Sequence, residues 1–118
     1  MLTVLRKPTP SGAMVLELAG TLTLGNSCQE LEWEVDNLLK EGSKKIVFDL
    51  TKLTRVDSAG IGIIVRTSGK VRVGGGDFRA AGATGQVQEI VTLTRIDSIV
   101  DFYTDVQKAV EAAAGAGA

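Results

Sequence analysis

The stretch that most constrains the fold covers residues 45–50. It contains three consecutive apolar residues, Ile46-Val47-Phe48, and ends at Leu50. A strand that is apolar at consecutive positions is buried on both faces, which is typical of parallel sheets covered by helices on both sides. The stretch therefore predicts a buried strand of an α/β domain.

Two strands are predicted upstream, over residues 2–7 and 13–19. Residues 8–12, between them, are rich in Pro, Ser and Gly, which favour turns, and so short a connection predicts antiparallel pairing. A loop over residues 20–27 then leads into a helix that ends near Gly42. The apolar face of this helix is predicted from residues at helical spacing: Cys28, Leu31, Val35 and Leu38.

Two features of this helix are open to interpretation. Its predicted N-cap is Asn26 or Ser27, because Ser27 and Glu30 have the spacing of a capping box. Trp33 lies off the apolar face, so it either marks a surface that contacts a partner or packs under a neighbouring loop.

Downstream of the buried strand, helix and strand patterns alternate. Helices are predicted over residues 58–74 and 86–94 and after Thr104 or Asp105, and strands over residues 77–81 and 98–103. The order β-β-α-β-α-β-α-β-α predicts a largely parallel mixed sheet with right-handed crossovers. We expect one α/β domain over residues 1–113, with a flexible Ala/Gly tail over residues 114–118.

Composition excludes several classes of function. The net charge is −1 with both signs interspersed, so nothing indicates binding to nucleic acid or to an anionic membrane. No apolar run is long enough to span a membrane, there is no leader pattern, and the single Cys suits a reducing compartment; we expect a cytoplasmic protein. The absence of His excludes Ser-His-Asp and Cys-His sites and His-ligated metals, while carboxylate or Lys chemistry stays possible. Because the sequence contains no catalytic constellation, no enzyme activity, cofactor or metal is expected.

The stretch with the most chemical information is Val56-Asp57-Ser58-Ala59-Gly60-Ile61-Gly62, at a predicted helix start. Asp and Ser are preferred N-cap residues, because their oxygens accept free amide hydrogens of the first turn. The positive end of a helix is also a good place for a phosphate. From local sequence alone, an ordinary helix start and a phosphate-accepting serine both remain possible.

The two glycines of this stretch need an explanation, since each costs about 1 kcal/mol relative to Ala inside a helix. One explanation is the close approach of a partner's backbone at Gly60 and Gly62. The other is close packing of the helix onto its own sheet. The two explanations are compatible.

In a parallel sheet, the loops that follow the strands emerge at the same end. The loops over residues 21–27, 51–58 and 82–85 should therefore cluster around Ser58. The candidate site is thus expected to include residues far from Ser58 in the sequence.

The strand followed by Asp57-Ser58-Ala59-Gly60-Ile61-Gly62 resembles the STAS domain, and more narrowly the bacterial anti-sigma factor antagonists, whose pattern is Asp-Ser-(Ser/Thr/Ala)-Gly-Leu-Gly. Gly20-Thr21-Leu22 is similar to the end of the family's second strand, and residues 78–82 to its fourth. The chain departs from the family at Thr23, where relatives often have Asp, and at Ala59, which leaves Ser58 as the one hydroxyl of the motif.

The resemblance implies a protein-binding module controlled by phosphorylation of Ser58. Unphosphorylated, it would bind an anti-sigma factor or serine kinase of the ATPase fold and free a sigma factor; a phosphatase would reset it. The resemblance also implies a monomer or weak dimer. Asp57 would cap the helix, orient magnesium bound by the kinase, or do both. The residues implied in partner binding are Asp57, Ser58, Ala59, Gly60, Ile61, Gly62, Thr21, Thr23, Asn26, Ser27 and Thr84.

Two alternatives remain: a scaffold subunit of a large stress-sensing assembly, and an accessory subunit of a lipid transporter. A second copy of the motif's first half also exists, because residues 53–58 recur nearly unchanged as residues 93–98. The second copy lacks the Ala-Gly-Ile-Gly continuation and is followed by a predicted strand. We interpret it as chance or shared capping chemistry.

Overall fold

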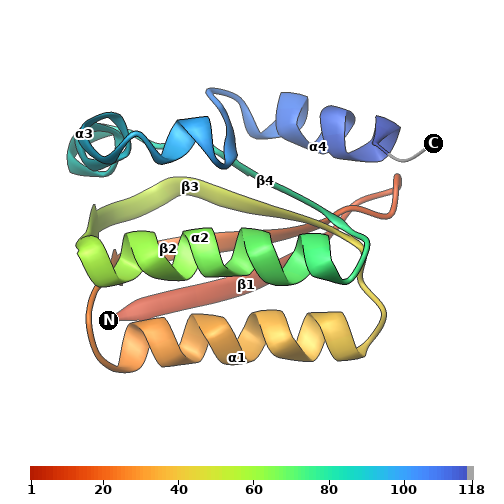
Figure 1. Ribbon diagram of the computed structural model, residues 1–118, viewed down its shortest axis with the longest axis horizontal. Helices are drawn as coiled ribbons and strands as arrows, with labels where there is room; N and C mark the ends of the chain where they lie inside the picture. Colours follow the sequence, from red (N-terminus) through yellow and green to blue (C-terminus); the bar gives the residue numbers. More distant parts are fainter. Residues whose placement is uncertain (117–118) are drawn as a thin grey trace.

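A five-stranded sheet runs through the middle of the protein, whose computed structural model describes residues 1–116 (Figure 1). The strands lie in the sheet in the order of the sequence, and only the first pair is antiparallel. They are β1 (Leu2–Pro8), β2 (Met14–Leu22), β3 (Lys45–Val56), β4 (Asp77–Ala81) and β5 (Asp101–Tyr103). The predicted α/β class and mixed, largely parallel sheet are confirmed.

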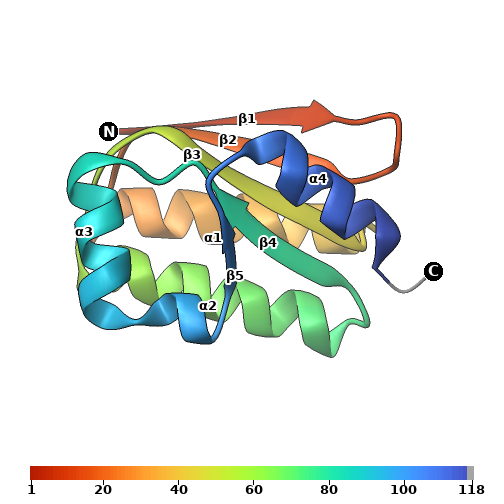
Figure 2. The ribbon, with the colours of Figure 1, turned by 90° about the horizontal axis from the view of Figure 1, so that it is seen from above.

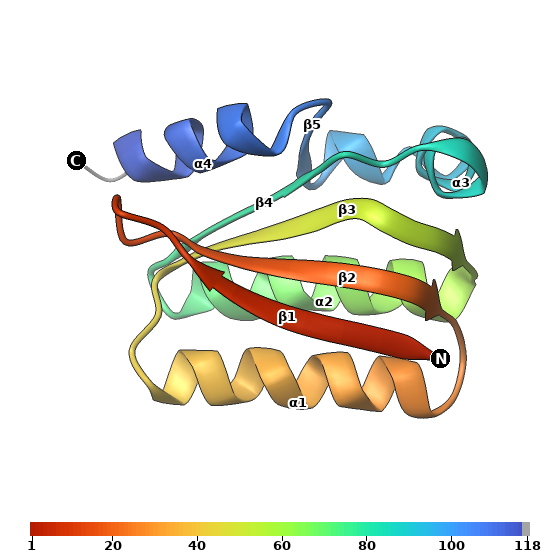
Figure 3. The same cartoon turned by 180° about the vertical axis from the view of Figure 1, so that it is seen from behind.

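Helices cover both faces of the sheet. The helix α1 (Asn26–Lys40) and the helix α2 (Ser58–Val73) lie side by side on one face, and α4 (Val106–Gly115) lies on the other (Figures 1 and 3). The helix α3 (Gly85–Thr94) lies beside the end of β3 (Figure 2), and a short 3₁₀ helix, η1 (Ile96–Ser98), follows it. Within residues 1–116, no helix has the length and apolar character that crossing a bilayer requires.

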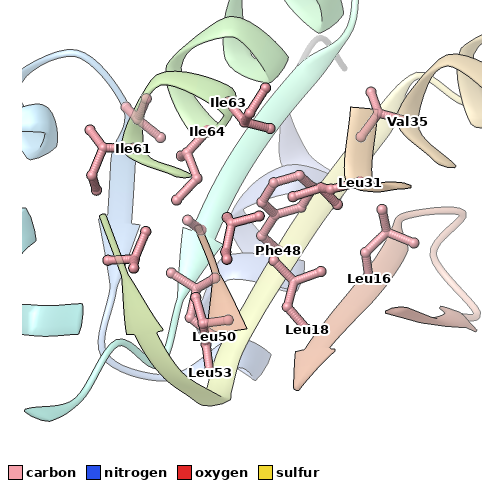
Figure 4. Packing of buried hydrophobic residues seen from close by; sticks show 14 of the residues in the cluster. Leu16, Leu18, Leu31, Val35, Phe48, Leu50, Leu53, Ile61, Ile63 and Ile64 are labelled. Atoms are coloured by element: carbon pink, nitrogen blue, oxygen red, sulfur yellow. The ribbon is translucent and has the colours of Figure 1, made fainter. Parts of the chain in front are cut away.

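The main core lies between the sheet and the helices α1 and α2 (Figure 4). Phe48 of β3 sits at its centre, edge-on to Phe78 of β4 with 4.7 Å between the ring centroids, a favourable aromatic geometry. All four residues predicted for the apolar face of α1 are buried. Among them, Cys28 donates its thiol to the Thr23 carbonyl at 3.2 Å, and burial raises the pKa of that thiol, so packing rather than reactivity explains it.

A smaller core lies under α4 on the other face. Val47 points into it and is fully buried, while its neighbours Ile46 and Phe48 point into the main core. The prediction that this strand is buried on both faces is confirmed. The other buried residues of the smaller core are small, which lets α4 approach the sheet: Ala13, Val15, Ala81, Ala109, Val110 and Ala113.

The second and third strands are longer than predicted. We expected β2 to end at Ala19 and β3 at Leu50, with loops beyond them, but both strands continue and pair in parallel as far as Leu22 and Val56. The local pattern there is mixed polar and apolar, so the pairing of two distant segments decides the structure. The predicted loop over residues 51–58 is thus mostly strand.

The starts of α1 and of the last strand differ from expectation, whereas α4 begins after one of the two caps that the sequence left open. The N-cap of α1 is Gly25, and the predicted capping box does not form, because the Ser27 hydroxyl bonds the Thr23 backbone instead. The last strand is shortened, since Ser98 belongs to η1. Of the two predicted caps of α4, Asp105 is the one that accepts amide hydrogens.

The Ala/Gly segment 114–118, predicted as a flexible tail, begins inside α4. The helix continues to Gly115, and Lys45 donates to the Ala114 carbonyl at 2.9 Å. Residues 117–118 of the predicted tail lie outside the described part. Trp33 is exposed over 77% of its surface, so it does not pack under a neighbouring loop, and its role as a contact surface stays a hypothesis.

Candidate functional site

The helix α2 begins at the end of β3, and Asp57 is its N-cap. Asp57 has extended backbone geometry, and its Oδ1 accepts the Gly60 N–H at 2.9 Å, the usual N-cap arrangement. The predicted strand-to-helix transition at Asp57-Ser58 is confirmed.

Asp57 also binds a second loop. Its Oδ2 accepts the Leu24 N–H at 2.9 Å, although Leu24 lies in the connection between β2 and α1. The Leu24 amide, followed by the Gly60 amide, holds the pKa of the Asp57 carboxyl below its ordinary value, because both donate to the ionised form. Both carboxylate oxygens are thus engaged in shaping the site, which supports the capping role of Asp57.

Ser58, the first residue of α2, is exposed. Across residues 1–116, its hydroxyl makes no hydrogen bond with another protein group. Asp57 rather than Ser58 takes the Gly60 amide, so the helix start offers fewer free donors than the sequence alone suggests. The Ser58 hydroxyl is therefore accessible and unengaged.

The two glycines of the motif have different environments. A Cβ added to Gly60 would lie 2.3 Å from the Leu22 carbonyl oxygen and 2.5 Å from Cγ2 of Val56. A Cβ on Gly62 would meet nothing within 4 Å, and Gly62 is exposed. Close packing onto the sheet thus explains Gly60, and it does not explain Gly62.

The predicted clustering of loops at this end of the sheet is confirmed. The loop after β2 reaches the site through Leu24, and the Asp57 N–H donates to the Leu22 carbonyl at 3.4 Å. The segment after β4 reaches it through Gln86 of α3, whose side-chain amide donates to the Val56 carbonyl and accepts its N–H, both at 2.9 Å.

The residues predicted for partner binding do not all face solvent. Gly60 and Ile61 are buried, and Ala59 is half-buried and packs against the main core. The exposed members are Ser58, Gly62, Asn26 and Thr84, with Thr21, Thr23, Ser27 and Asp57 half-buried beside them. Thr84 is the N-cap of α3, and its side chain makes no capping hydrogen bond.

Two residues of the site, Leu24 and Gln86, were not predicted from the sequence. Leu24 is 82% exposed beside Asp57, and Gln86 bonds the end of β3. Exposed Leu and helical Gln are common in any sequence, so only the spatial neighbourhood of these two distinguishes them. The second Asp-Ser copy, by contrast, lies elsewhere: Ser98 is in η1, and its hydroxyl donates to the Arg95 carbonyl at 2.7 Å.

Replacing Asp57 by Asn is expected to destabilise the protein in a pH-dependent way. The folded-state pKa of Asp57 is lowered, so its contribution to stability is complete above the unfolded value of about 4 and is lost as pH falls through the folded value. Asn caps helices about as well as Asp, but it has only one acceptor oxygen, so at pH 7 the variant should lose about 1 kcal/mol because it cannot accept both the Gly60 and the Leu24 N–H. Urea unfolding at pH 7 and pH 3 tests this, and a difference between the two proteins that is the same at both pH values would contradict it.

Taken together, fold and site define a small α/β domain whose parallel strands present an Asp-Ser helix start at one end. The STAS domain family model matches residues 5–109, so the chain belongs to the STAS domain family. A Thermotoga maritima protein named "Putative anti-sigma factor antagonist" is 29% identical over 90 residues, which cover 76% of this chain and 80% of that protein.

Solved structures agree with the fold. The crystal structure of a putative anti-sigma factor antagonist from Thermotoga maritima superimposes with a TM-score of 0.83 at 25% identity and covers 93% of each chain. The anti-sigma factor antagonist SpoIIAA in its unphosphorylated form has a TM-score of 0.72 and covers 96% of this chain and 99% of its own. It is 14% identical, so its likeness concerns the fold alone.

Proposed function

We propose that this protein is an anti-sigma factor antagonist, a binding module controlled by phosphorylation of Ser58. The observation that carries the proposal is the exposed, unengaged Ser58 hydroxyl at a helix start held by Asp57. The name of the Thermotoga maritima relative supports the same class of function.

The partner-binding surface consists of the exposed residues around Ser58, on the segments after β2, β3 and β4. Gly62 lets a partner's backbone approach α2, because no side chain stands between that position and solvent. Leu24 adds an exposed apolar side chain next to Asp57, of the kind that fills a pocket in a partner. Surfaces of this composition suit a protein rather than a nucleic acid, since the chain carries a net charge of −1.

In the cell, the unphosphorylated protein binds an anti-sigma factor or serine kinase of the ATPase fold in the cytoplasm, and a sigma factor is released. Phosphorylation of Ser58 ends the binding, and a phosphatase restores it. The protein itself contributes no catalysis. Size-exclusion chromatography of the purified chain with its native partners separates this proposal, which expects a monomer or weak dimer, from the scaffold alternative, which expects a megadalton particle.

Phosphorylation is expected at Ser58 and not at Ser98, although both follow Asp in nearly the same local sequence. Ser98 lies in a 3₁₀ turn that uses its hydroxyl, and it lacks the open helix start next to Gly62. Incubation with the serine kinase encoded in the same genome and ATP, followed by phosphopeptide mapping, tests the assignment. Phosphate that persists in Ser58→Ala would refute it, and Ser98→Ala is the matched control.

A further inference from the structure

The second half of β3 lacks a strand partner on one side. The strand β4 pairs only with residues 45–49 of β3, whereas β2 accompanies β3 as far as Val56. Val56 is 1% exposed, so water does not readily satisfy its backbone N–H and C=O. Its hydrogen bonds on the unpaired side must therefore come from another part of the chain.

Gln86 supplies both hydrogen bonds. Its Oε1 accepts the Val56 N–H and its Nε2 donates to the Val56 carbonyl, each at 2.9 Å. A single side-chain amide in α3 thus replaces the missing strand at the last residue of β3. The two partners are 30 residues apart in the sequence.

The carbonyl held by Gln86 belongs to the peptide unit that joins Val56 to Asp57. The N–H of this unit donates to the Leu22 carbonyl of β2, so the unit is held from both sides. This peptide unit leads directly into Asp57, whose carboxylate accepts the N–H groups of Leu24 and Gly60. A chain of hydrogen bonds therefore leads from α3 to the residue that precedes Ser58.

We propose that Gln86 is a positioning residue of the Ser58 site: its amide holds the Val56–Asp57 peptide, and through it the Asp57 carboxylate and the start of α2. The expected effect on Ser58 phosphorylation rests on the proposed function, whereas the positioning of Asp57 by Gln86 does not. Gln86 itself is half-buried, and in this proposal it does not contact the partner.

The test compares Gln86→Leu with a matched control on the same helix. Gln88→Leu also removes a side-chain amide, but Gln88 is exposed, and its amide donates to the Thr92 hydroxyl at 3.1 Å. Amide hydrogen exchange measured by NMR follows three N–H groups: Val56, which loses its acceptor, and Leu24 and Gly60, which bond Asp57. In Gln86→Leu all three should exchange faster, Val56 by about tenfold, the change expected for one lost hydrogen bond. In Gln88→Leu all three should keep the wild-type rates.

Two outcomes would overturn the proposal. The first is an unchanged Val56 rate. The second is faster exchange at Val56 alone, because Gln86 would then connect α3 to β3 without positioning Asp57. If Gln86→Leu does not fold, Gln86→Glu replaces it, since the carboxylate keeps the acceptor for the Val56 N–H but at neutral pH has no hydrogen for the carbonyl. Leu24 and Gly60 should again exchange faster, and wild-type rates at both would refute the proposal.

A kinetic measurement separates this proposal from the proposed function. With the serine kinase from the same genome, Gln86→Leu should lower kcat for Ser58 phosphorylation several-fold while Gln88→Leu leaves it unchanged. Equal kcat values for Gln86→Leu and wild type would contradict the link to Ser58. If the wild type is itself not phosphorylated on Ser58, the proposed function fails, and the exchange rates still decide whether Gln86 positions Asp57.

Discussion

Gly60→Ala is expected to be among the most destabilising single substitutions in this protein. The new Cβ would lie 2.3 Å from the Leu22 carbonyl oxygen, and a backbone atom inside a parallel sheet cannot move aside cheaply. The start of α2 must then shift away from β2, which costs about 3 kcal/mol, at the upper end of overpacking effects. Thermal unfolding should show a decrease in Tm of about 10 °C.

Gly62→Ala is the matched control, two residues along the same helix. Its Cβ meets nothing within 4 Å, so the variant should gain about 0.5–1 kcal/mol from the better helix propensity of Ala. The same variant should bind the partner more weakly if a partner backbone approaches α2 there. Equal unfolding free energies for the two variants would show that close packing does not explain Gly60.

Ser58→Asp is expected to fold normally and to lose binding to the anti-sigma factor by a hundredfold or more. A phosphate adds about −1.5 to −2 charge at pH 7, and Asp imitates part of it. In the free protein the position is exposed, so the favourable helix end, typically 0.3 to 1 kcal/mol, and the repulsion by neighbouring Asp57 nearly balance. In the complex the charge is desolvated against a surface that fits a neutral hydroxyl, and an unpaired buried charge costs several kcal/mol.

Calorimetric titration of wild type, Ser58→Asp and Ser58→Ala with the partner measures the effect, because each tenfold loss in affinity is about 1.4 kcal/mol. Ser58→Ala should bind constitutively and serves as the control for the lost hydroxyl. Thermal unfolding must accompany the titration. If Ser58→Asp unfolds far below the wild type, lost binding reports lost structure, and the electrostatic mechanism would have to be abandoned.

The elements predicted correctly are those with a strong local signal. The helix α1 has apolar residues at helical spacing, and all four of them are buried, since one face of an isolated helix already defines its buried side. The two-sided burial of Ile46, Val47 and Phe48 follows from three apolar residues in succession. The start of α2 at Ser58 follows from capping chemistry that involves only neighbours within one turn.

The wrong predictions arise where a contact in the folded chain outweighs the local pattern, whether the partner is distant in the sequence or a few residues away. Residues 51–56 look like a loop because their pattern is mixed, but pairing with β2 makes them a strand. Ser27 has the spacing of a capping box, yet the Thr23 backbone engages its hydroxyl and Gly25 becomes the cap. Local propensity was overridden in both places by contacts that only the folded chain provides.

The sequence by itself determined the class of fold, the buried faces of its elements and the position of Asp57-Ser58 at a helix start. These properties depend on periodicity and capping among residues close in the chain. Only the tertiary structure decided that Asp57 binds Leu24, 33 residues away, that Gln86 completes the end of β3, and that Gly60 lies against Leu22 while Gly62 is open. The physical reason is that a hydrogen bond or a steric contact depends on the distance between atoms in space, and at one end of a parallel sheet the loops of several crossovers come together whatever their separation in the sequence.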